Sequence, residues 1–270
     1  MSMLPNTYMP QYITTPDGVA RALGLQPSAI HCPGFLAAIP GPIDPTLPES
    51  ALCEFDDWPH QLPVLDQGSW NACTYYASTQ ALQYGRYQSG QPYTSLNPLW
   101  PYLLATGGQN VGTNLIEASL RIEQYGIPPV QAQPRSQAEI SSDAQRFRFE
   151  LSEQLSTYEQ ILSEVARHRA VVCSVCVSNR WNQLDAEGVP GVTRGQGNHA
   201  IFLGGGLIKS KVHGWMPKTV GTWGTAWGQG GFGWYSREHF DATRYFEAFT
   251  EAAVIEDLAD GDNPPPVLIA

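Results

Sequence analysis

The chain has 270 residues, of which 42% are hydrophobic and 15% are charged, and its formal net charge is −10. A chain of this length can bury a substantial core, as one domain or as two closely packed lobes. The acidic balance argues against nucleic acid or an anionic membrane as the main partner, because both are bound through a basic surface. No apolar stretch reaches the length of a membrane span, and the N-terminus lacks the basic and apolar regions of a signal peptide. We therefore expect a cytoplasmic protein, or one delivered without a classical signal peptide.

The cysteines are spread unevenly along the chain, at Cys32, Cys53, Cys73, Cys173 and Cys176. Such an odd and irregular set does not predict a disulfide framework, and a reducing compartment suits it. Cys173 and Cys176 form a CxxC pair, but the run AVVCSVCV around them has the composition of a buried strand, and no second pair at metal-binding spacing accompanies them. We therefore expect neither a metal nor a cofactor.

Residues 1–54 are predicted to form an extended arm. Prolines interrupt every periodic pattern there, at Pro27, Pro33, Pro40, Pro42, Pro45 and Pro48, so the segment cannot form a domain by itself. After the arm, the stretch from Ala72 to Tyr87 lacks Gly and Pro until Gly85 and places apolar side chains along one face. This pattern predicts a helix with Asn71 or Ser69 near its N-cap.

The remaining predicted elements are helices in the first half of the chain and mostly strands in the second. A second helix is expected from Asn114 to Tyr125, and a third over residues 141–167 with an interruption near Tyr158. The second half contains short β-prone runs separated by Gly and Pro, namely AVVCSVCVS, HAIFLGGGL and KTVGTWGTAWG. A helical half followed by a strand-rich half predicts an α+β protein of two lobes with its site in the cleft between them. Residues 252–270 are expected to be a C-terminal tail.

Cys73 is the first candidate functional residue. The string QGSWNAC at residues 67–73 places a flexible turn directly before the first predicted helix, so the thiol lies in its first turn. Unpaired backbone N–H groups and the positive end of the helix dipole favour a thiolate there, and the same groups can receive an oxyanion. Gln67 could bring its side-chain amide to the same place and complete an oxyanion hole. The alternative is a small buried cysteine without chemistry.

His199 is the natural base for such a thiol. It opens the run HAIFLG, which is predicted to be a strand, and it follows the turn Gly195–Asn198. An imidazolium sustains a thiolate at neutral pH. The alternative is a core histidine at a strand edge. His60 and His168 lie in polar surroundings and receive no role.

These residues resemble the papain family of cysteine peptidases. QGSWNAC is similar to the entry of the family's active-site helix, GNHAIFLGGG is similar to its histidine strand, and His199 follows Cys73 at about the family's separation of roughly 130 residues. FDDW at residues 55–58 resembles the start of the mature enzymes, VGTNLIEASLRIEQYGI resembles the turn and helix after the nucleophile helix, and TWGTAWGQGGFGWY resembles the tryptophan–glycine motif near the end. The resemblance covers about residues 55–251, which we expect to form a papain-like peptidase domain with a helical lobe and a β-barrel-like lobe.

The resemblance implies a role for each matching position. Cys73 would attack the scissile carbonyl, His199 would share and deliver the proton, and Gln67 with the Cys73 N–H would hold the oxyanion. Gly112 and Thr113 fall where the family's paired glycines bind the backbone of an extended substrate, and Trp223 matches the tryptophan that shields the histidine on the leaving-group side. The later tryptophans Trp227 and Trp234 are expected in the core.

Several positions depart from the family pattern. Gly221 stands where the family has the asparagine that orients the imidazole, so a water, a backbone carbonyl or another residue must do this. Thr222 stands where serine is common, and Thr113 replaces the second glycine, which would narrow that subsite. In the turn, Trp70 replaces a cysteine whose disulfide partner would stand at about Asn110. Thr74 replaces the tryptophan that commonly follows the nucleophile, so local packing must differ.

The leading hypothesis is thiol-dependent hydrolysis of peptide bonds in a polypeptide substrate. The alternative from another class is a catalytically weak or inactive papain-fold module that binds a protein partner, which Gly221 and the proline-rich arm favour. A third hypothesis keeps the fold but makes the reaction acyl transfer or deamidation, because the same thioester can be resolved by an amine or by water. The arm would be a short prosegment laid in the cleft, or a docking arm for a protein partner.

Overall fold

A computed structural model describes residues 11–26, 45–130 and 136–253, and it has the predicted α+β class. The helices are α1 (Cys73–Gln88), α2 (Leu99–Thr106), α3 (Leu115–Tyr125), α4 (Gln137–Ala144), α5 (Tyr158–Ala166) and α6 (Arg237–Ala242), with short 3-10 helices at Glu49–Ala51, Asn179–Asn182 and Gly224–Ala226. The strands are β1 (Gln11–Thr14), β2 (Ala20–Leu23), β3 (Phe55–Asp56), β4 (Phe149–Gln154), β5 (Ala170–Val175), β6 (Gly195–Gln196), β7 (His199–Ser210), β8 (Gly214–Val220), β9 (Phe232–Trp234), β10 (Thr243–Arg244) and β11 (Ala248–Ala253).

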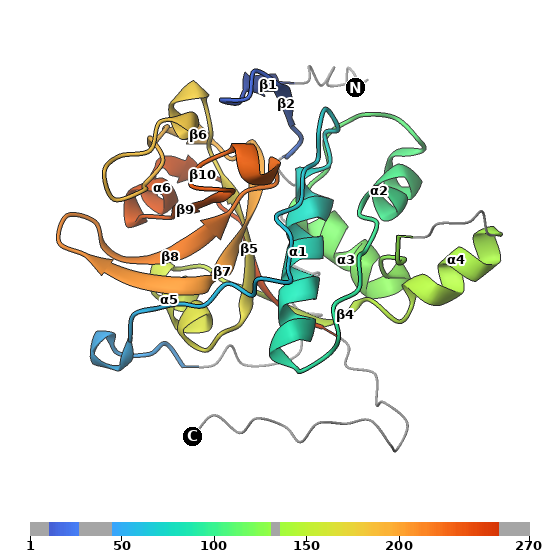
Figure 1. The fold of residues 1–270 in the computed structure, drawn as a ribbon, viewed down its shortest axis with the longest axis horizontal. Coiled ribbons are helices and arrows are strands. Elements are labelled where there is room, and N and C mark those ends of the chain that lie inside the picture. Colours follow the sequence, from blue (N-terminus) through green and yellow to red (C-terminus); the bar gives the residue numbers. More distant parts are fainter. Residues whose placement is uncertain (1–10, 27–44, 131–135, 254–270) are drawn as a thin grey trace, which may run out of the picture.

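One sheet of seven strands forms the second lobe. Its order is β4-β11-β5-β7-β8-β9, and β3 pairs with β7 off this path. All of these pairings are antiparallel. The expected barrel-like lobe is an open sheet, since β4 and β9 lie at its two ends and do not pair with each other within the described residues. Figure 1 shows β5, β7, β8 and β9 of this sheet on one side of α1 and the helices α2, α3 and α4 on the other.

The sheet has a hydrophobic core on each face, because the side chains of a strand alternate. In β5, Val172 contributes to the core around α1, whereas Val171 and Cys173 contribute to the core around α5. In β7, Phe202 contributes to the core around α1, and Ile201 contributes to the core around α5. Helix α1 packs against β7 and also against α2 and α3, so it lies at the junction of the two lobes.

The ends of the predicted helices are partly as expected. Asn114 caps α3, and its side chain accepts a hydrogen bond from the Glu117 N–H, so this helix is confirmed. Asn71 lies directly before the N-cap of α1, as expected, but Ala72 takes the cap position and makes no side-chain cap. The side chain of Asn71 instead donates to the backbone and side chain of Asn110.

The predicted helix over residues 141–167 is wrong in its middle. Helix α4 ends at Ala144, and β4 then runs to Gln154 before Thr157 caps α5. The run RFRF that leads into β4 alternates arginine with the buried rings of Phe147 and Phe149. This period of two suits a strand, and antiparallel pairing with β11 decides between strand and helix.

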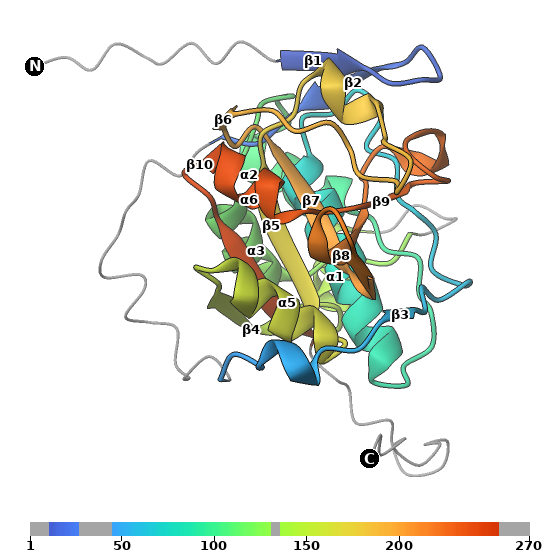
Figure 2. The ribbon, with the colours of Figure 1, turned by 90° about the vertical axis from the view of Figure 1, so that its left-hand side faces the viewer.

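The N-terminal arm contains more structure than expected. β1 and β2 form an antiparallel hairpin in which Gln11 lies opposite Leu23 and Thr14 lies opposite Ala20. Figures 1 and 2 place this hairpin at one end of the molecule. Cys32 and the prolines from Pro27 to Pro42 lie outside the described residues, as do residues 254–270 of the expected tail. In the part of the chain that the structure describes, no helix is both long and apolar enough to cross a bilayer.

Candidate active site

Cys73 is the first residue of α1, the helix that packs against both lobes. Its side chain is fully buried. The backbone N–H groups of Ala200, Gly24, Thr74 and Cys73 itself lie close to the sulfur and act to lower its pKa. The contact with Ala200 places the thiol beside the start of β7, where His199 is the adjacent residue. The structure therefore brings the Cys73 thiol to the backbone next to His199, a segment far away in the sequence.

The loop before α1 is fastened to the segment that contains Trp223. Asp66 forms an isolated antiparallel bridge with Trp223, the Gln67 N–H donates to the Thr222 carbonyl over 2.8 Å, and the Gly224 N–H donates to the Leu65 carbonyl over 3.0 Å. This pairing brings Gln67, which is 1% exposed, to the side of the site that carries Thr222.

The side-chain amide of Gln67 has a fixed orientation. Its Nε2 donates to the carbonyl oxygens of Trp70 and Ala22, over 2.7 and 3.0 Å. Its Oε1 accepts from the Thr222 hydroxyl over 2.5 Å. The amide nitrogen, which is the group that an oxyanion hole requires, therefore points at a backbone carbonyl of the N-terminal arm.

His199 is held between Trp223 and Thr222. Its ring packs on the indole of Trp223 with centroids 4.5 Å apart, and its Nε2 lies 3.4 Å from Thr222 Oγ1. Its Nδ1 is buried and finds no hydrogen-bond partner among the described residues. Trp223 thus packs on His199, and the contact between His199 and Thr222 is one that the sequence analysis missed. A hydroxyl residue directly before Trp223 was the available signal.

The place of the missing asparagine is filled by an aromatic ring. A Cβ atom at Gly221 would lie 2.6 Å from Trp227 Cε3, so no side chain fits there. Trp227 is fully buried, stacks on Trp181 at 5.6 Å, and meets Trp223 edge-on at 6.4 Å. The core position predicted for Trp227 is therefore confirmed, and the same ring excludes any side chain at position 221.

Two departures from the family pattern compensate each other. The hydroxyls of Thr74 and Thr113 lie 2.6 Å apart in a buried hydrogen bond. The Thr113 side chain is therefore turned toward α1, and its backbone N–H and carbonyl remain available for pairing. Gly112 is also buried, directly before this pairing position.

The arm passes directly over these residues. The Thr113 N–H donates to the Gly24 carbonyl over 2.8 Å, the Gln26 N–H donates to the Thr113 carbonyl over 2.9 Å, and Leu25 pairs with Thr113 in a parallel bridge. Gly24 approaches the body so closely that a Cβ atom would lie 2.1 Å from the Asn71 carbonyl oxygen. Glycine is therefore the residue that this position requires.

Arg21 fixes the other end of the same segment. Its guanidinium forms ion pairs with Asp66 and Asp17, both at 2.9 Å, and the side chain is 6% exposed. Residues 21–26 thus span the site from Asp66, past Cys73, to Thr113.

Burial controls the protonation of the two candidate catalytic groups. Burial raises the pKa of the Cys73 thiol to about 11, although the surrounding N–H groups oppose the shift. Burial also lowers the pKa of His199 to about 3. In this state the pair is a neutral thiol and a neutral imidazole at pH 7.

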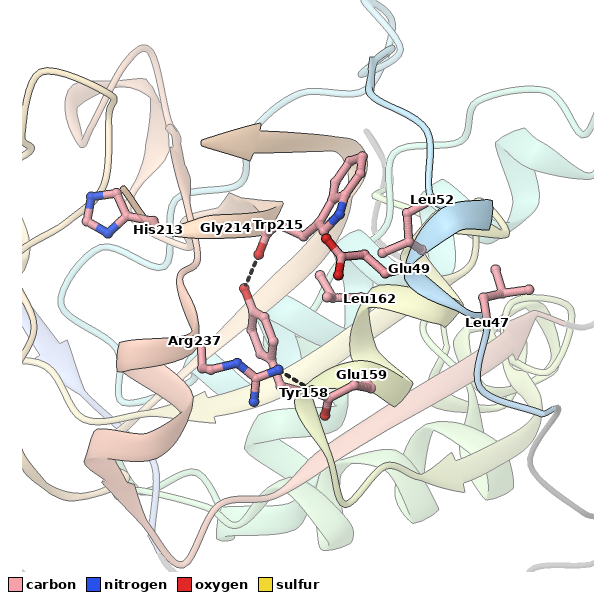
Figure 3. Close-up of a pocket in the computed structure, with 10 residues that line it drawn as sticks. All are labelled: Leu47, Glu49, Leu52, Tyr158, Glu159, Leu162, His213, Gly214, Trp215 and Arg237. Atoms are coloured by element: carbon pink, nitrogen blue, oxygen red, sulfur yellow. Dashed lines mark hydrogen bonds and ion pairs between the residues drawn. The ribbon is translucent and has the colours of Figure 1, made fainter. Parts of the chain in front are cut away.

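A separate cavity of about 240 Å³ lies in the sheet lobe and contains none of the predicted site residues. Figure 3 shows Leu47 and Leu52 on one side of it and Tyr158 and Arg237 on the other. The Tyr158 hydroxyl donates to the Trp215 carbonyl over 2.8 Å, and Arg237 pairs with the Glu159 carboxylate. Within the lining, Arg237 is thus neutralised by Glu159, whereas Glu49 and His213 pair with Lys209 and Asp185 outside it. The described residues include no cluster of three side chains suited to bind a metal ion.

No protein-family model and no curated protein sequence matches this chain. Solved structures do match its fold. Xylellain, a cysteine protease from Xylella fastidiosa, superposes with a TM-score of 0.65 at 17% identity, over 92% of this chain and 100% of that one. Digestive procathepsin L 3 from Tenebrio molitor gives 0.57 at 19% identity, over 73% and 69% of the two chains. A structure from work on the mite allergens Blo t 1 and Der p 1 gives 0.61 at 17% identity, over 85% and 80%. The chain therefore has a papain-like fold.

Proposed function

We propose that this chain is a papain-like cysteine peptidase in which Cys73 is the nucleophile, His199 the general base and Gln67 the oxyanion donor. One observation carries the proposal. The backbone beside His199 lies close to the thiol at the first position of α1, and the Gln67 amide is directed at the carbonyl of Ala22, two residues before Gly24, whose N–H also lies close to that thiol. A carbonyl in that place is where a scissile peptide group would lie, so the arrangement suits acyl transfer to sulfur.

The proposed reaction gives each of these groups a step. His199 Nδ1 takes the Cys73 proton, and the thiolate attacks the carbonyl carbon. The oxyanion is bound by the Gln67 Nε2 and the Cys73 N–H, and its collapse breaks the C–N bond as Nδ1–H protonates the leaving amine. Water, deprotonated by Nδ1, then hydrolyses the thioester and restores the thiol. Gly112 and Thr113 would pair with the substrate backbone, and Trp223 would cover the leaving-group side.

We further propose that the N-terminal arm is a prosegment that keeps the enzyme latent. In a substrate, the residues after the scissile bond lie on the leaving-group side. In the arm, Arg21, which precedes Ala22, lies on that side through its ion pair with Asp66, and Leu25 lies at Thr113. The arm therefore runs opposite to a substrate, so the Ala22 carbonyl can occupy the oxyanion site without productive alignment of its peptide bond.

A catalytically weak or inactive module that binds a protein partner is the second candidate. Gly221 favours it, because no side chain at that position can orient the imidazole. It differs from the first candidate in predicting that Cys73→Ala leaves the biological role intact.

Covalent capture of Cys73 tests the enzyme proposal. The full chain and its Gly24→Val variant would be incubated with a peptidyl epoxide, and the labelled cysteine would be identified by mass spectrometry. Valine at position 24 cannot seat against Asn71, so we expect fast labelling of Cys73 in the variant and slow labelling in the unchanged chain.

The matched control is Gly18→Ala at the tip of the same hairpin. A Cβ atom at Gly18 meets nothing within 4 Å, although its φ of +78° adds strain at the turn. This variant is expected to keep the arm seated and the labelling slow. If Cys73 of Gly24→Val stays unlabelled while the exposed Cys53 reacts with a small thiol reagent, the peptidase proposal is wrong. Equal labelling of all three chains would instead reject only the latent state.

A further inference from the structure

We infer that the Thr222 hydroxyl is the group that positions the His199 ring, in place of the side chain that Gly221 lacks. The inference rests on the proposed function, because a positioned imidazole matters only if His199 is the base. It assigns to Thr222 a role that the resemblance does not provide. The observation behind it is that Thr222 Oγ1 lies between Gln67 Oε1, at 2.5 Å, and His199 Nε2, at 3.4 Å.

The hydrogens in this chain of contacts have only one consistent arrangement. Gln67 Nε2 donates to two carbonyl oxygens, so the opposite atom of the amide, Oε1, must accept. The single hydroxyl hydrogen of Thr222 therefore points at Gln67. Only the oxygen lone pairs of Thr222 remain for His199, so His199 Nε2 must carry the hydrogen.

This arrangement selects the tautomer that the reaction needs. With the hydrogen on Nε2, the lone pair of the neutral ring lies on Nδ1, which is buried and without a partner among the described residues. That nitrogen is then available to accept the Cys73 proton. When the ring becomes an imidazolium, Nε2–H continues to donate to Thr222, so the contact is kept through the proton transfer.

The surrounding residues supply no equivalent contact in the described part of the chain. Gly221 has no side chain, and Trp227 occupies the space beside it. Trp223 packs on the face of the imidazole at 4.5 Å, which fixes the plane of the ring but leaves its two nitrogens unassigned. Thr222 is thus the residue that distinguishes the two nitrogens.

The same hydroxyl couples two parts of the site. By donating to Gln67 Oε1 it also fixes which end of the Gln67 amide faces the oxyanion position. A substitution that removes the hydroxyl therefore disturbs the base and the oxyanion donor together. Such a coupled effect is expected for a positioning residue that contacts both groups.

The test compares three substitutions at Thr222 in the full-length Gly24→Val chain. Thr222→Val keeps the shape and removes the hydroxyl, Thr222→Ala removes hydroxyl and methyl, and Thr222→Ser keeps the hydroxyl. The readouts are the rate of Cys73 capture by the peptidyl epoxide and the nitrogen-15 shifts of the His199 ring, which report the tautomer. The matched control is Thr219→Val, because the buried Thr219 hydroxyl has no hydrogen-bond partner among the described residues.

The Val and Ala variants are expected to capture the epoxide about 10- to 100-fold more slowly, the loss associated with one hydrogen bond to a charged group. Thr222→Ser is expected to restore the rate, and Thr219→Val to leave it unchanged. The nitrogen shifts should show the hydrogen of the His199 ring on Nε2 when Thr222 is kept and when it is replaced by Ser. They should show a mixture of the two tautomers in Thr222→Val.

Two outcomes would overturn the inference. In the first, Thr222→Val has the same rate of Cys73 capture and the same His199 tautomer as Thr222→Ser. In the second, the His199 ring carries its hydrogen on Nδ1 even when Thr222 is kept. If Cys73 is unreactive in every chain, the peptidase proposal fails, but the nitrogen shifts still decide whether Thr222 sets the tautomer. If Thr222→Val does not fold, the Ala and Ser variants make the same comparison of the hydroxyl.

Discussion

The indole of Trp227 fills the space into which any side chain at Gly221 would project, with 2.6 Å from Cε3 to the position of a Cβ atom. Trp227 cannot easily withdraw, because it is fully buried and its Nε1 donates to the Trp181 carbonyl over 3.3 Å. The glycine and the tryptophan therefore form a matched pair. The absence of an orienting side chain at position 221 is a consequence of this packing.

Restoring the family's asparagine should consequently harm the protein. We expect Gly221→Asn to lower the free energy of unfolding by about 1–3 kcal/mol through overpacking, and not to raise the rate of Cys73 capture. Urea unfolding and epoxide labelling measure the two effects. In a Trp227→Leu background the same substitution should cost less, since the ring that it strikes is smaller. A faster and equally stable Gly221→Asn chain would contradict this account.

Reaction of Cys73 with iodoacetamide should depend steeply on pH while the arm is seated. With the Cys73 pKa raised to about 11, the thiolate fraction rises about tenfold per pH unit between pH 7 and 10. In Gly24→Val the thiol loses part of its burial, so the rate at pH 7 should be higher and the pH dependence shallower. Site-resolved mass spectrometry would follow Cys73, with the exposed Cys53 as a check on the reagent. Identical pH profiles in the two chains would show that the arm does not control the thiol.

Acid should destabilise the folded chain through His199. Its pKa is lowered from 6.5 to about 3 by burial, so the unfolded chain binds the proton first as the pH falls. The contribution of His199 to stability is therefore fully present above pH 6.5 and is lost progressively toward pH 3. Between pH 7.5 and pH 5 the loss should amount to about 2 kcal/mol of the free energy of unfolding.

His199→Phe provides the comparison for this pH effect, because it keeps an aromatic ring against Trp223 and cannot titrate. Its stability should fall less between pH 7.5 and pH 5 than that of the unchanged chain. His239, whose pKa burial lowers to about 4, contributes in both chains and cancels in the difference. Parallel stability curves, measured by urea unfolding at each pH, would rule out the neutral buried state of His199.

Asn110 should hold the loop before α1 in the place where the family has a disulfide. Its Oδ1 accepts from the Asn71 N–H over 2.7 Å and from the Tyr102 hydroxyl over 3.1 Å, and its Nδ2 donates to the Ser69 carbonyl over 3.1 Å. Asn110→Ala should lower the free energy of unfolding by about 1–3 kcal/mol, because buried partners are left unpaired. The neighbouring Gln109→Ala, which removes an exposed side chain, serves as the control. Equal unfolding midpoints for the two variants would mean that Asn110 does not hold the loop.

The sequence predicted those parts of the fold that depend on local pattern. The helix after Asn114 is recognisable from its cap, and β5 and β7 are recognisable from their runs of buried apolar residues. The strand β4 was taken for helix, because its pairing with β11 joins segments roughly a hundred residues apart, and no local pattern reports such a pairing.

In the candidate site, too, features of local sequence were predicted and contacts between distant elements were not. Order and residue type were enough to select Cys73, His199 and Gln67, since a thiol at a helix start and a histidine opening a strand are local features. The contact between Thr222 and His199, the Thr74–Thr113 hydrogen bond and the exclusion of a side chain at Gly221 were not predictable. Each depends on the distance between atoms that different elements supply.

By itself, the sequence determined that this protein has a papain-like fold and which residues are candidates for its chemistry, because those features are written in short motifs. The tertiary structure decided how these residues are buried, packed and hydrogen-bonded. It places the arm over Cys73, fills the space beside Gly221 with Trp227 and sets Thr222 between Gln67 and His199. These outcomes follow from close packing, in which a single Cβ atom or hydroxyl hydrogen determines what can lie beside a reactive group.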